Sequence, residues 1–226
     1  PVTVKDRNIY ANINNIITNP QLYYFGPSTE PLWIATGSGT NTIAYSADSI
    51  NWLGLSTTVF STSGNAVKWN GSIWVALGQG TNSVAYSYNG LLWNGLGTTI
   101  FANYGNSAIW YEKQQMWIIG GSDTSSSNNI SYSYDTLNWS SVNSSIFSTS
   151  CNDFATNQKL LVAVGNGSTN TIAYSFDGST WTGLGSTIFS SSGNGISCNG
   201  NLFVAVGSGT SNNVSYLSWT TDFGNW

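Results

Sequence analysis

The stretch IWVALGQGTNSVAYSYNGLLW, residues 73–93, decides the fold because close variants of it recur along the chain. Each copy opens with an apolar run that ends in Gly. Successive runs begin 41, 43, 44 and 42 residues apart, at LWIATG (32–37), IWVALG (73–78), MWIIGG (116–121), LLVAVG (160–165) and LFVAVG (202–207). A fixed period of this length indicates a repeat architecture in which every copy folds in the same way.

Each copy contains the same parts in the same order. The apolar run is followed by a Gly/Ser/Thr/Asn loop, a second strand such as TIAYS (42–46 and 171–175) and a tight turn that ends in Trp. In the first four copies a further stretch then leads to Val/Ile-Phe, at 59–60, 100–101, 146–147 and 188–189. Another short strand starts at an Asn five residues after that Phe. Four short strands with no helical periodicity in 40–45 residues are typical of a β-propeller blade.

We therefore predict an all-β, five-bladed β-propeller of four-stranded antiparallel blades. It forms a single domain over 1–226, with repeats at approximately 19–55, 64–97, 105–142, 151–185 and 193–226. Residues 1–18 are expected to form an N-terminal arm or closing strand. Pairing of the N- and C-terminal strands would then close the ring and remove exposed sheet edges. The alternative is an open arc of blades that belongs to a longer protein.

The turn before each Trp has a recurrent signature, as in SFDGSTW (175–181). These turns resemble Asp-box (BNR-type) repeats, which recur in sialidases and in many non-enzymatic propellers. In such a turn a Ser or Thr and an Asp bond neighbouring backbone amides, and the Trp buries an apolar face. A catalytic group would be needed once, so recurrence in every copy favours a structural role. The positions concerned are Ser46, Asp48, Trp52, Ser87, Asn89, Trp93, Ser133, Asp135, Trp139, Ser175, Asp177, Trp181, Thr220, Asp222 and Trp226.

The catalytic apparatus that the sialidase resemblance implies is missing. Sialidases bind the substrate carboxylate with three arginines, and this chain has one, Arg7. The chain has no His and two Cys, which excludes His-based catalysis and Cys-rich zinc sites. The acids outside the turns are scattered: Asp6, Glu30, Glu112, Asp123 and Asp153. We predict no enzyme activity, no catalytic residue, no metal and no cofactor.

Charge excludes further classes of function. Charged residues make up 6% of the chain, the net charge is −4, and the five cations are scattered, so no basic stripe can neutralise nucleic-acid phosphates. No apolar run reaches the roughly 20 residues of a membrane span. The abundance of hydroxyl, amide and aromatic side chains is typical of exposed, β-rich surface proteins.

Two rows of Asn are the candidate ligand-binding residues. In a four-stranded blade, the GSGTN-type loops and the connections between blades share one face of the disc. We place there Asn41, Asn82, Asn170 and Asn212 in one row, and Asn65, Asn106, Asn152 and Asn194 in the other. Repeated amides near aromatic rings suit neutral sugars, and several weak sites would give avid attachment. The alternative is that each Asn satisfies a turn. Phe60, Phe101, Phe147 and Phe189 are expected to be wedges between blades.

A second resemblance concerns the sequence pattern of residues 69–101, which looks like that of tandem repeats in proteins of large DNA viruses of algae and protists. It implies an extracellular or virion-surface location. The predicted function is a lectin-like, glycan- or receptor-binding module, with other capsid or surface proteins as possible partners. The rival interpretation is a purely structural capsid or filament subunit whose loop faces pack against protein.

The two cysteines are predicted to be unpaired. In the aligned repeats Cys198 lies five residues further along its strand than Cys151 does, which is about 16 Å at the rise of a β-strand. A disulfide requires Cα atoms within roughly 7 Å.

Overall fold

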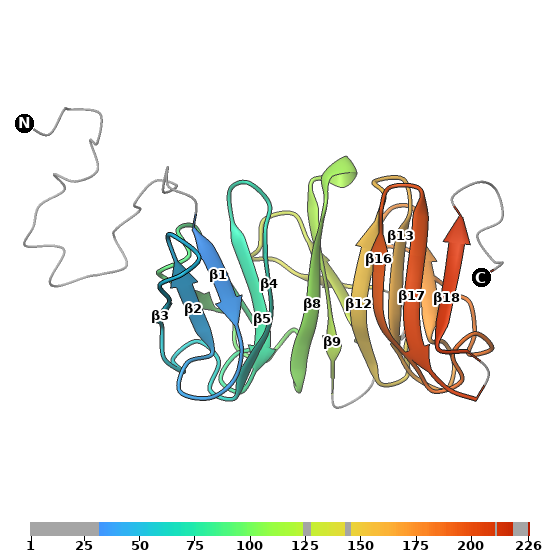
Figure 1. Ribbon diagram of the computed structural model, residues 1–226, viewed down its shortest axis with the longest axis horizontal. Coiled ribbons are helices and arrows are strands. Elements are labelled where there is room, and N and C mark those ends of the chain that lie inside the picture. Colours follow the sequence, from blue (N-terminus) through green and yellow to red (C-terminus); the bar gives the residue numbers. More distant parts are fainter. Residues whose placement is uncertain (1–31, 124–127, 143–145, 211, 219–225) are drawn as a thin grey trace, which may run out of the picture.

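The computed structural model describes residues 32–123, 128–142, 146–210, 212–218 and 226 (Figure 1). In these residues the chain folds into β-strands and one 3-10 helix, η2 (Glu112–Gln114). No helix in the described ranges is long and apolar enough to cross a membrane. The predicted closing strand in residues 1–18, together with Thr220 and Asp222, lies outside the described residues.

The described strands form five successive antiparallel meanders, which follow the five sequence repeats. The three central meanders contain four strands each, and three strands of the first and of the last are described. In chain order the meanders are β1 (Trp33–Thr36), β2 (Ile43–Ser46), β3 (Leu53–Gly54); β4 (Ser63–Trp69), β5 (Trp74–Gln79), β6 (Val84–Ser87), β7 (Asn94–Gly95); β8 (Tyr104–Tyr111), β9 (Met116–Ser122), β10 (Ile130–Ser133), β11 (Ser140–Ser141); β12 (Ser150–Thr156), β13 (Leu161–Asn166), β14 (Ile172–Ser175), β15 (Thr182–Gly183); β16 (Ser192–Cys198), β17 (Leu202–Ser208), β18 (Val214–Ser218).

Both faces of each central meander are covered, which explains why the apolar runs do not alternate with polar residues. In β13, Val162 and Val164 pack with residues of the following meander, such as Phe203. The intervening Ala163 packs with residues of the preceding meander, such as Ile118. The core of the molecule is therefore a series of apolar layers between consecutive meanders.

The four Phe residues are wedges between meanders, as expected, and all are fully buried. Each ring lies against the Gly that ends an apolar run. A Cβ added at Gly78 or Gly165 would lie 2.5 Å from the Cγ of Phe60 or Phe147, so no larger residue fits there. The close approach of an aromatic ring thus explains the Gly that ends each of the last four runs: Gly78, Gly121, Gly165 and Gly207.

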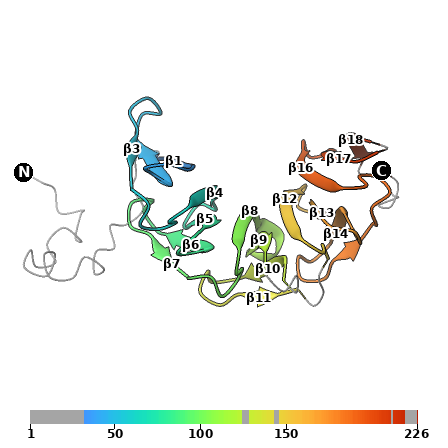
Figure 2. The same ribbon diagram turned by 90° about the horizontal axis from the view of Figure 1, so that it is seen from below.

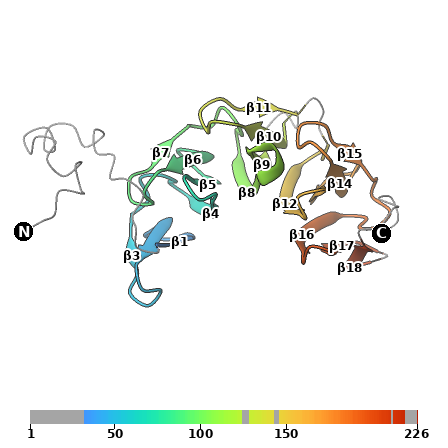
Figure 3. The ribbon, with the colours of Figure 1, turned by 90° about the horizontal axis from the view of Figure 1, so that it is seen from above.

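The meanders are arranged side by side along an open arc (Figures 2 and 3). The long strands β4, β8, β12 and β16 line its concave side, and the two-residue outer strands lie on the convex side. The meander of β1–β3 and the meander of β16–β18 stand apart at the two ends of the arc. The predicted all-β architecture of antiparallel sheets in a propeller-like arrangement is confirmed. The number of blades and the closure by terminal strands stay predictions.

Candidate functional site

The signature turns are held by one carboxylate that bonds several backbone amides. In the third meander, Asp135 Oδ1 accepts hydrogen bonds from the backbone N–H of Leu137 (2.9 Å) and Asn138 (2.7 Å). The Ser133 hydroxyl also donates to Asp135 (3.1 Å). The indole N–H of Trp139 donates to the Thr136 carbonyl at 2.9 Å. The same bonds recur around Asp48 and Asp177, so these acids organise the turns that carry them.

The second meander shows that the turn does not need a charge. Asn89 stands at the Asp position, and its Oδ1 accepts from the N–H of Leu91 (3.0 Å) and Leu92 (2.9 Å). An amide oxygen therefore performs the same bonding as the carboxylates. The fifth copy lies outside the described residues, apart from Trp226, which packs half-buried against the cluster between the last two meanders.

These bonds lower the pKa of the turn carboxyl groups. For Asp48 and Asp135 the pKa is far below its ordinary value, first because of the backbone N–H of Asn51 and Asn138, respectively. Burial acts to raise the pKa of Asp177, but the hydrogen bonds from Thr180, Ser179 and Ser175 together outweigh it and the pKa is lowered. All three side chains are carboxylates at neutral pH.

The first row of predicted Asn residues joins the hairpin loops to the segments that connect meanders. Asn82 accepts from the N–H of Gly97 (2.8 Å) and donates to the Val59 carbonyl. Asn170 bonds Gly185 (2.9 Å) and Ile146 (2.8 Å) in the same way. Asn41 accepts from Ser56, and Asn212 donates to Ile188.

The sequence interpretation missed a member of this row, Asn128, which donates to the Ile100 carbonyl at 3.0 Å. It lies thirteen residues before Ser141, as Asn82 and Asn170 lie thirteen residues before Gly95 and Gly183. A Cβ at either Gly would collide with the Asn amide. In the third meander that Gly is replaced by Ser141, and the Asn128 amide instead bonds Ser131 (3.0 Å). This spacing was the signal that could have revealed Asn128.

The second row of predicted Asn residues occupies the β-bulges of the innermost strands. The register of each inner strand shifts at this residue, between Gly64/Ala66, Gly105/Ser107, Cys151/Asp153 and Gly193/Gly195. A bulge inserts one extra residue and redirects its side chain. Here the redirected amide donates to a backbone carbonyl of the next meander: Asn65 to Gly105 (2.9 Å), Asn106 to Cys151 (3.0 Å) and Asn152 to Gly193 (2.8 Å). We call this series the amide ladder.

All eight predicted Asn residues thus lie at one end of the meanders, and in seven of them the amide bonds the backbone of another segment. Asn194 ends the amide ladder. Its Oδ1 accepts from Ser192 (2.7 Å), and its amide has no acceptor in the part of the chain that the structure describes. This geometry agrees with the alternative interpretation, in which the Asn residues satisfy the backbone.

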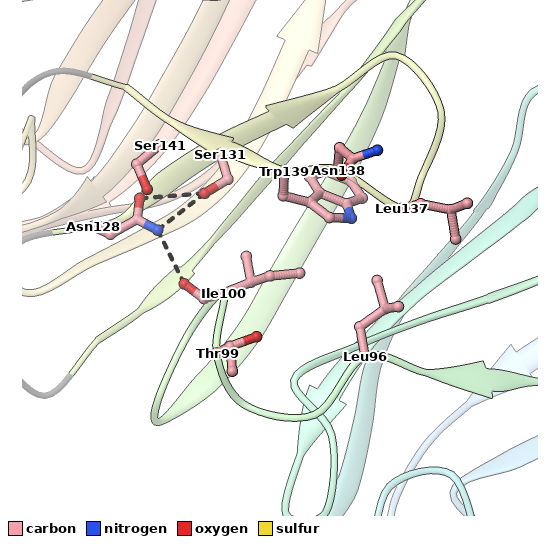
Figure 4. Close-up of a pocket in the computed structure, with 9 residues that line it drawn as sticks. All are labelled: Leu96, Thr99, Ile100, Asn128, Ser131, Leu137, Asn138, Trp139 and Ser141. Carbon is pink, nitrogen blue, oxygen red and sulfur yellow. Dashed lines mark hydrogen bonds between the residues drawn. The ribbon is translucent and has the colours of Figure 1, made fainter.

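A cavity of about 340 Å³ opens between the second and third meanders (Figure 4). One wall is the connection that leaves β7, with Leu96, Thr99 and Ile100. The opposite wall is the outer hairpin of the third meander, with Asn128, Ser131, Leu137, Asn138, Trp139 and Ser141. Apolar and neutral polar side chains line this cavity, and none of the described lining residues is charged.

The other acids and the cysteines are placed as follows. Asp153 in β12 accepts from the Ser107 hydroxyl (2.9 Å) and from the Ile196 N–H (3.0 Å), so it joins three consecutive meanders. Glu112 accepts from the indole of Trp110 (2.6 Å). Among the described residues, no group of three His, Cys, Asp or Glu side chains could hold a metal ion. Cys151 is buried and Cys198 half-buried, and neither forms a disulfide.

Comparisons with known proteins support the fold, but they give no information about the candidate site. No family model matches the chain, and no curated protein matches it. A chain in the crystal structure of a nidogen/laminin complex has a TM-score of 0.62 at 10% identity, with 84% of this chain and 72% of that chain covered. The computationally designed Ika8 protein has a TM-score of 0.58 at 12% identity, with 87% of this chain and 59% of the designed chain covered. At such identities the likeness shows the fold alone, a propeller-like arrangement of β-meanders.

Proposed function

We propose that the chain is a non-enzymatic recognition module that binds a neutral glycan in the cavity between its second and third meanders. The observation that carries this proposal is the lining of that cavity, which combines one indole and three aliphatic side chains with amides and hydroxyls. Neutral sugars present apolar C–H faces and many hydroxyls, so they match a lining that has no net charge. Ligand sites of this kind are mostly apolar with a few placed polar groups.

The cavity is pre-organised for such a ligand. The Trp139 ring is held by its hydrogen bond to Thr136 (2.9 Å) and is half-buried, which leaves part of the ring available for stacking. Asn128 is fixed by its bonds to Ile100 and Ser131. The hydroxyls of Thr99 and Ser141 have no hydrogen-bond partner among the described residues, so they are available to a sugar.

A glycan array of uncharged oligosaccharides, followed by calorimetric titration of the best ligand, tests the proposal. Trp139→Ala should abolish binding. Thr99→Val keeps the shape of the side chain and removes one hydroxyl, and we expect about a five-fold loss of affinity, the worth of one hydrogen bond. Thr58→Val is the matched control, because Thr58 occupies the same place in the preceding connection, and it should leave affinity unchanged. Absence of binding to every glycan, or binding that neither cavity variant weakens, would overturn the proposal.

The absence of enzyme activity is part of the same proposal. The bonding of the turn carboxylates to backbone amides supports it, because those groups already have a structural task. Assays with sialosides and aryl glycosides should give no turnover above buffer, and a measurable rate that is lost on changing Glu112 would contradict it.

A surface location, on a virion or a cell, is proposed on the low charge and on the resemblance of residues 69–101 to viral repeats. The finer fold prediction, a five-bladed ring closed by terminal strands, depends on segments outside the described residues.

A second candidate function is that of a structural subunit, and uncovered apolar surface at the two ends of the arc favours it.

A further inference from the structure

The last described meander leaves one apolar face uncovered, which we call the trailing face: Val204, Val206, Val214 and Tyr216. These four side chains are between 36% and 67% exposed. Their counterparts one repeat earlier are Val162, Val164, Ile172 and Tyr174, and the first three of these are 0% exposed. The same sequence pattern is thus buried inside the arc and open at its end.

The first described meander leaves the opposite face uncovered, which we call the leading face: Trp33, Ala35, Ala44 and Trp52. Trp33 is 56% exposed, whereas Trp117, at the same place in the third meander, is 1% exposed. Ala35 and Ala44 are half-buried, whereas their counterparts Ala163 and Ala173 are fully buried. This face too is covered in the interior of the arc and open at its end.

The interior of the molecule shows what fits against each face. Between the last two meanders, Val162, Val164 and Ile172 of a trailing face pack with Phe203, Ala205 and Leu217 of a leading face. Between the second and third, Val75, Leu77 and Val84 pack with Trp117 and Ile119. Trailing faces bind leading faces throughout the arc. The described part of the chain therefore presents one uncovered copy of each half of its own internal interface.

The hydrogen bond of the amide ladder that accompanies this interface is also missing beside the trailing face of the last described meander. In each of three interior junctions an Asn of the amide ladder donates to a backbone carbonyl of the next meander. Asn194 is exposed beside the trailing face, and its amide has no acceptor among the described residues. The open end thus lacks both the apolar and the polar contacts of an interior junction.

We propose that copies of this chain associate head to tail, with the trailing face of one copy covered by the leading face of another. A second copy is the occupant because the two faces of a single chain stand apart at opposite ends of the arc (Figures 2 and 3). Neither face carries a charged residue, and exposed apolar patches of this kind mark interaction sites. Because the contact joins two different surfaces, it generates a closed ring or an open filament. This inference does not depend on glycan binding, since it uses the sheet faces at the ends and not the cavity.

Light scattering coupled to size exclusion, over a concentration series of the whole chain, tests the proposal. We expect the mass to rise with concentration from one copy to two or more. Val206→Asp and Trp33→Asp place a charge in the trailing and leading face, respectively, and each should shift the apparent dissociation constant at least ten-fold toward monomer. Tyr134→Asp is the control, because Tyr134 is 63% exposed on the turn of the third meander and lies in the middle of the arc, away from both faces, and it should leave the mass unchanged. Circular dichroism should be the same for all variants.

Mixing the two face variants separates head-to-tail association from other modes. Val206→Asp retains an intact leading face and Trp33→Asp an intact trailing face, so an equimolar mixture should form dimers that neither variant forms alone. A chain that remains monomeric at every concentration, as closure upon itself would require, overturns the proposal. So does an oligomer whose mass neither variant changes, or a mixture that gives no dimer. Glycan binding is measured separately, so failure of one proposal does not decide the other.

Discussion

At the scale of single residues, the Asp position of the signature turn requires a hydrogen-bond acceptor more than it requires a negative charge. Asp177 accepts from the N–H of Ser179 (2.9 Å) and Thr180 (2.7 Å), and Asn89 accepts from the equivalent pair at similar distances. The carboxylates still differ from Asn89 in one respect. Their lowered pKa means that folding favours the ionised form, so they link stability to pH.

Two replacements of Asp177 should show whether the turn is stabilised by the hydrogen-bond acceptor of this side chain or by its negative charge. Asp177→Asn keeps an oxygen that can accept both hydrogen bonds, as Asn89 does, and should change the free energy of unfolding by less than about 0.5 kcal/mol at neutral pH. Asp177→Ala leaves two backbone N–H groups without this partner and should cost about 1–2 kcal/mol. Urea unfolding of both variants measures the difference. Equal losses for Asn and Ala would mean that the charge, and not the acceptor, holds the turn.

The pH dependence of stability should come largely from these turns. Because the pKa of Asp48, Asp135 and Asp177 is lowered on folding, their contribution is present above the unfolded pKa of about 4 and is lost as pH falls through the lower folded values. The midpoint of thermal unfolding should therefore be flat from about pH 5 to 8 and fall below about pH 4. The triple variant with Asn at all three positions should lose most of that fall. A triple variant as acid-sensitive as the parent chain would contradict this assignment.

The two thiols should differ in reactivity. Burial raises the pKa of Cys151 well above its usual value, whereas Cys198 is half-buried at the end of β16. Alkylation without reductant should add one label to the folded chain and two to the denatured chain, as read by intact mass. Cys198→Ser should remove the label of the folded state. No label after denaturation would mean that the cysteines are bridged and that the aligned register is wrong.

At the scale of elements, the bulge of each inner strand links one meander to the next. The bulge directs an Asn side chain out of the strand that carries it and onto a carbonyl about 40 residues further along the chain. Asp153, beside the bulge of β12, adds contacts to the meanders on both sides. Neighbouring meanders are thus joined by side-chain bonds where their strands share few backbone pairs, of which Asn166 in β13 with Ser192 in β16 is an example.

The amide ladder can be tested with two bulges that differ in their partners. Asn152→Ala removes the bond to the Gly193 carbonyl (2.8 Å) and should lower the free energy of unfolding by about 1–2 kcal/mol. Asn194→Ala changes the matching bulge, whose amide has no acceptor in the described residues, and should cost less than about 0.5 kcal/mol in dilute solution. Chemical unfolding of both variants provides the comparison. Equal costs would show that the bulge geometry and not the ladder bond needs Asn.

At the scale of the whole molecule, the described chain is a series of similar layers in which each meander contacts its neighbours in sequence. Stability in such proteins is approximately a sum of unit and nearest-neighbour terms. The same residue type should therefore contribute differently in the middle and at the end of the arc. Val164 and Val206 form such a pair, because they occupy equivalent positions in successive meanders, 0% and 44% exposed.

Truncation of these two valines measures the interface between meanders. Val164→Ala should cost about 2 kcal/mol, because it removes two methyl groups from a closely packed layer. Val206→Ala should cost less than about 0.5 kcal/mol at concentrations where the chain is monomeric. Thermal or urea unfolding at low concentration checks both values. A large loss for Val206→Ala in the monomer would mean that another segment of the same chain covers the trailing face.

Much of this architecture could be predicted from local sequence patterns. The period, the antiparallel strands, the signature turns and the wedge role of Phe60, Phe101, Phe147 and Phe189 all follow from spacing and residue type. These features depend on contacts within one repeat or between adjacent repeats, and so they recur visibly in each copy. The sequence alone therefore determined a propeller-like stack of β-meanders and the end of the meanders at which the Asn rows lie.

The tertiary structure alone decided how those Asn residues are used and where a ligand could bind. Whether Asn106 reaches the Cys151 carbonyl depends on the distance and angle between two meanders, which no single repeat encodes. The cavity beside Trp139 is likewise formed by segments from two meanders, with Ser141 in place of a recurrent Gly. The exposure of Val206 against the burial of Val164 depends on which residues have a neighbour. Identical patterns become core or surface according to their position in the arc, and that position is a property of the assembled fold.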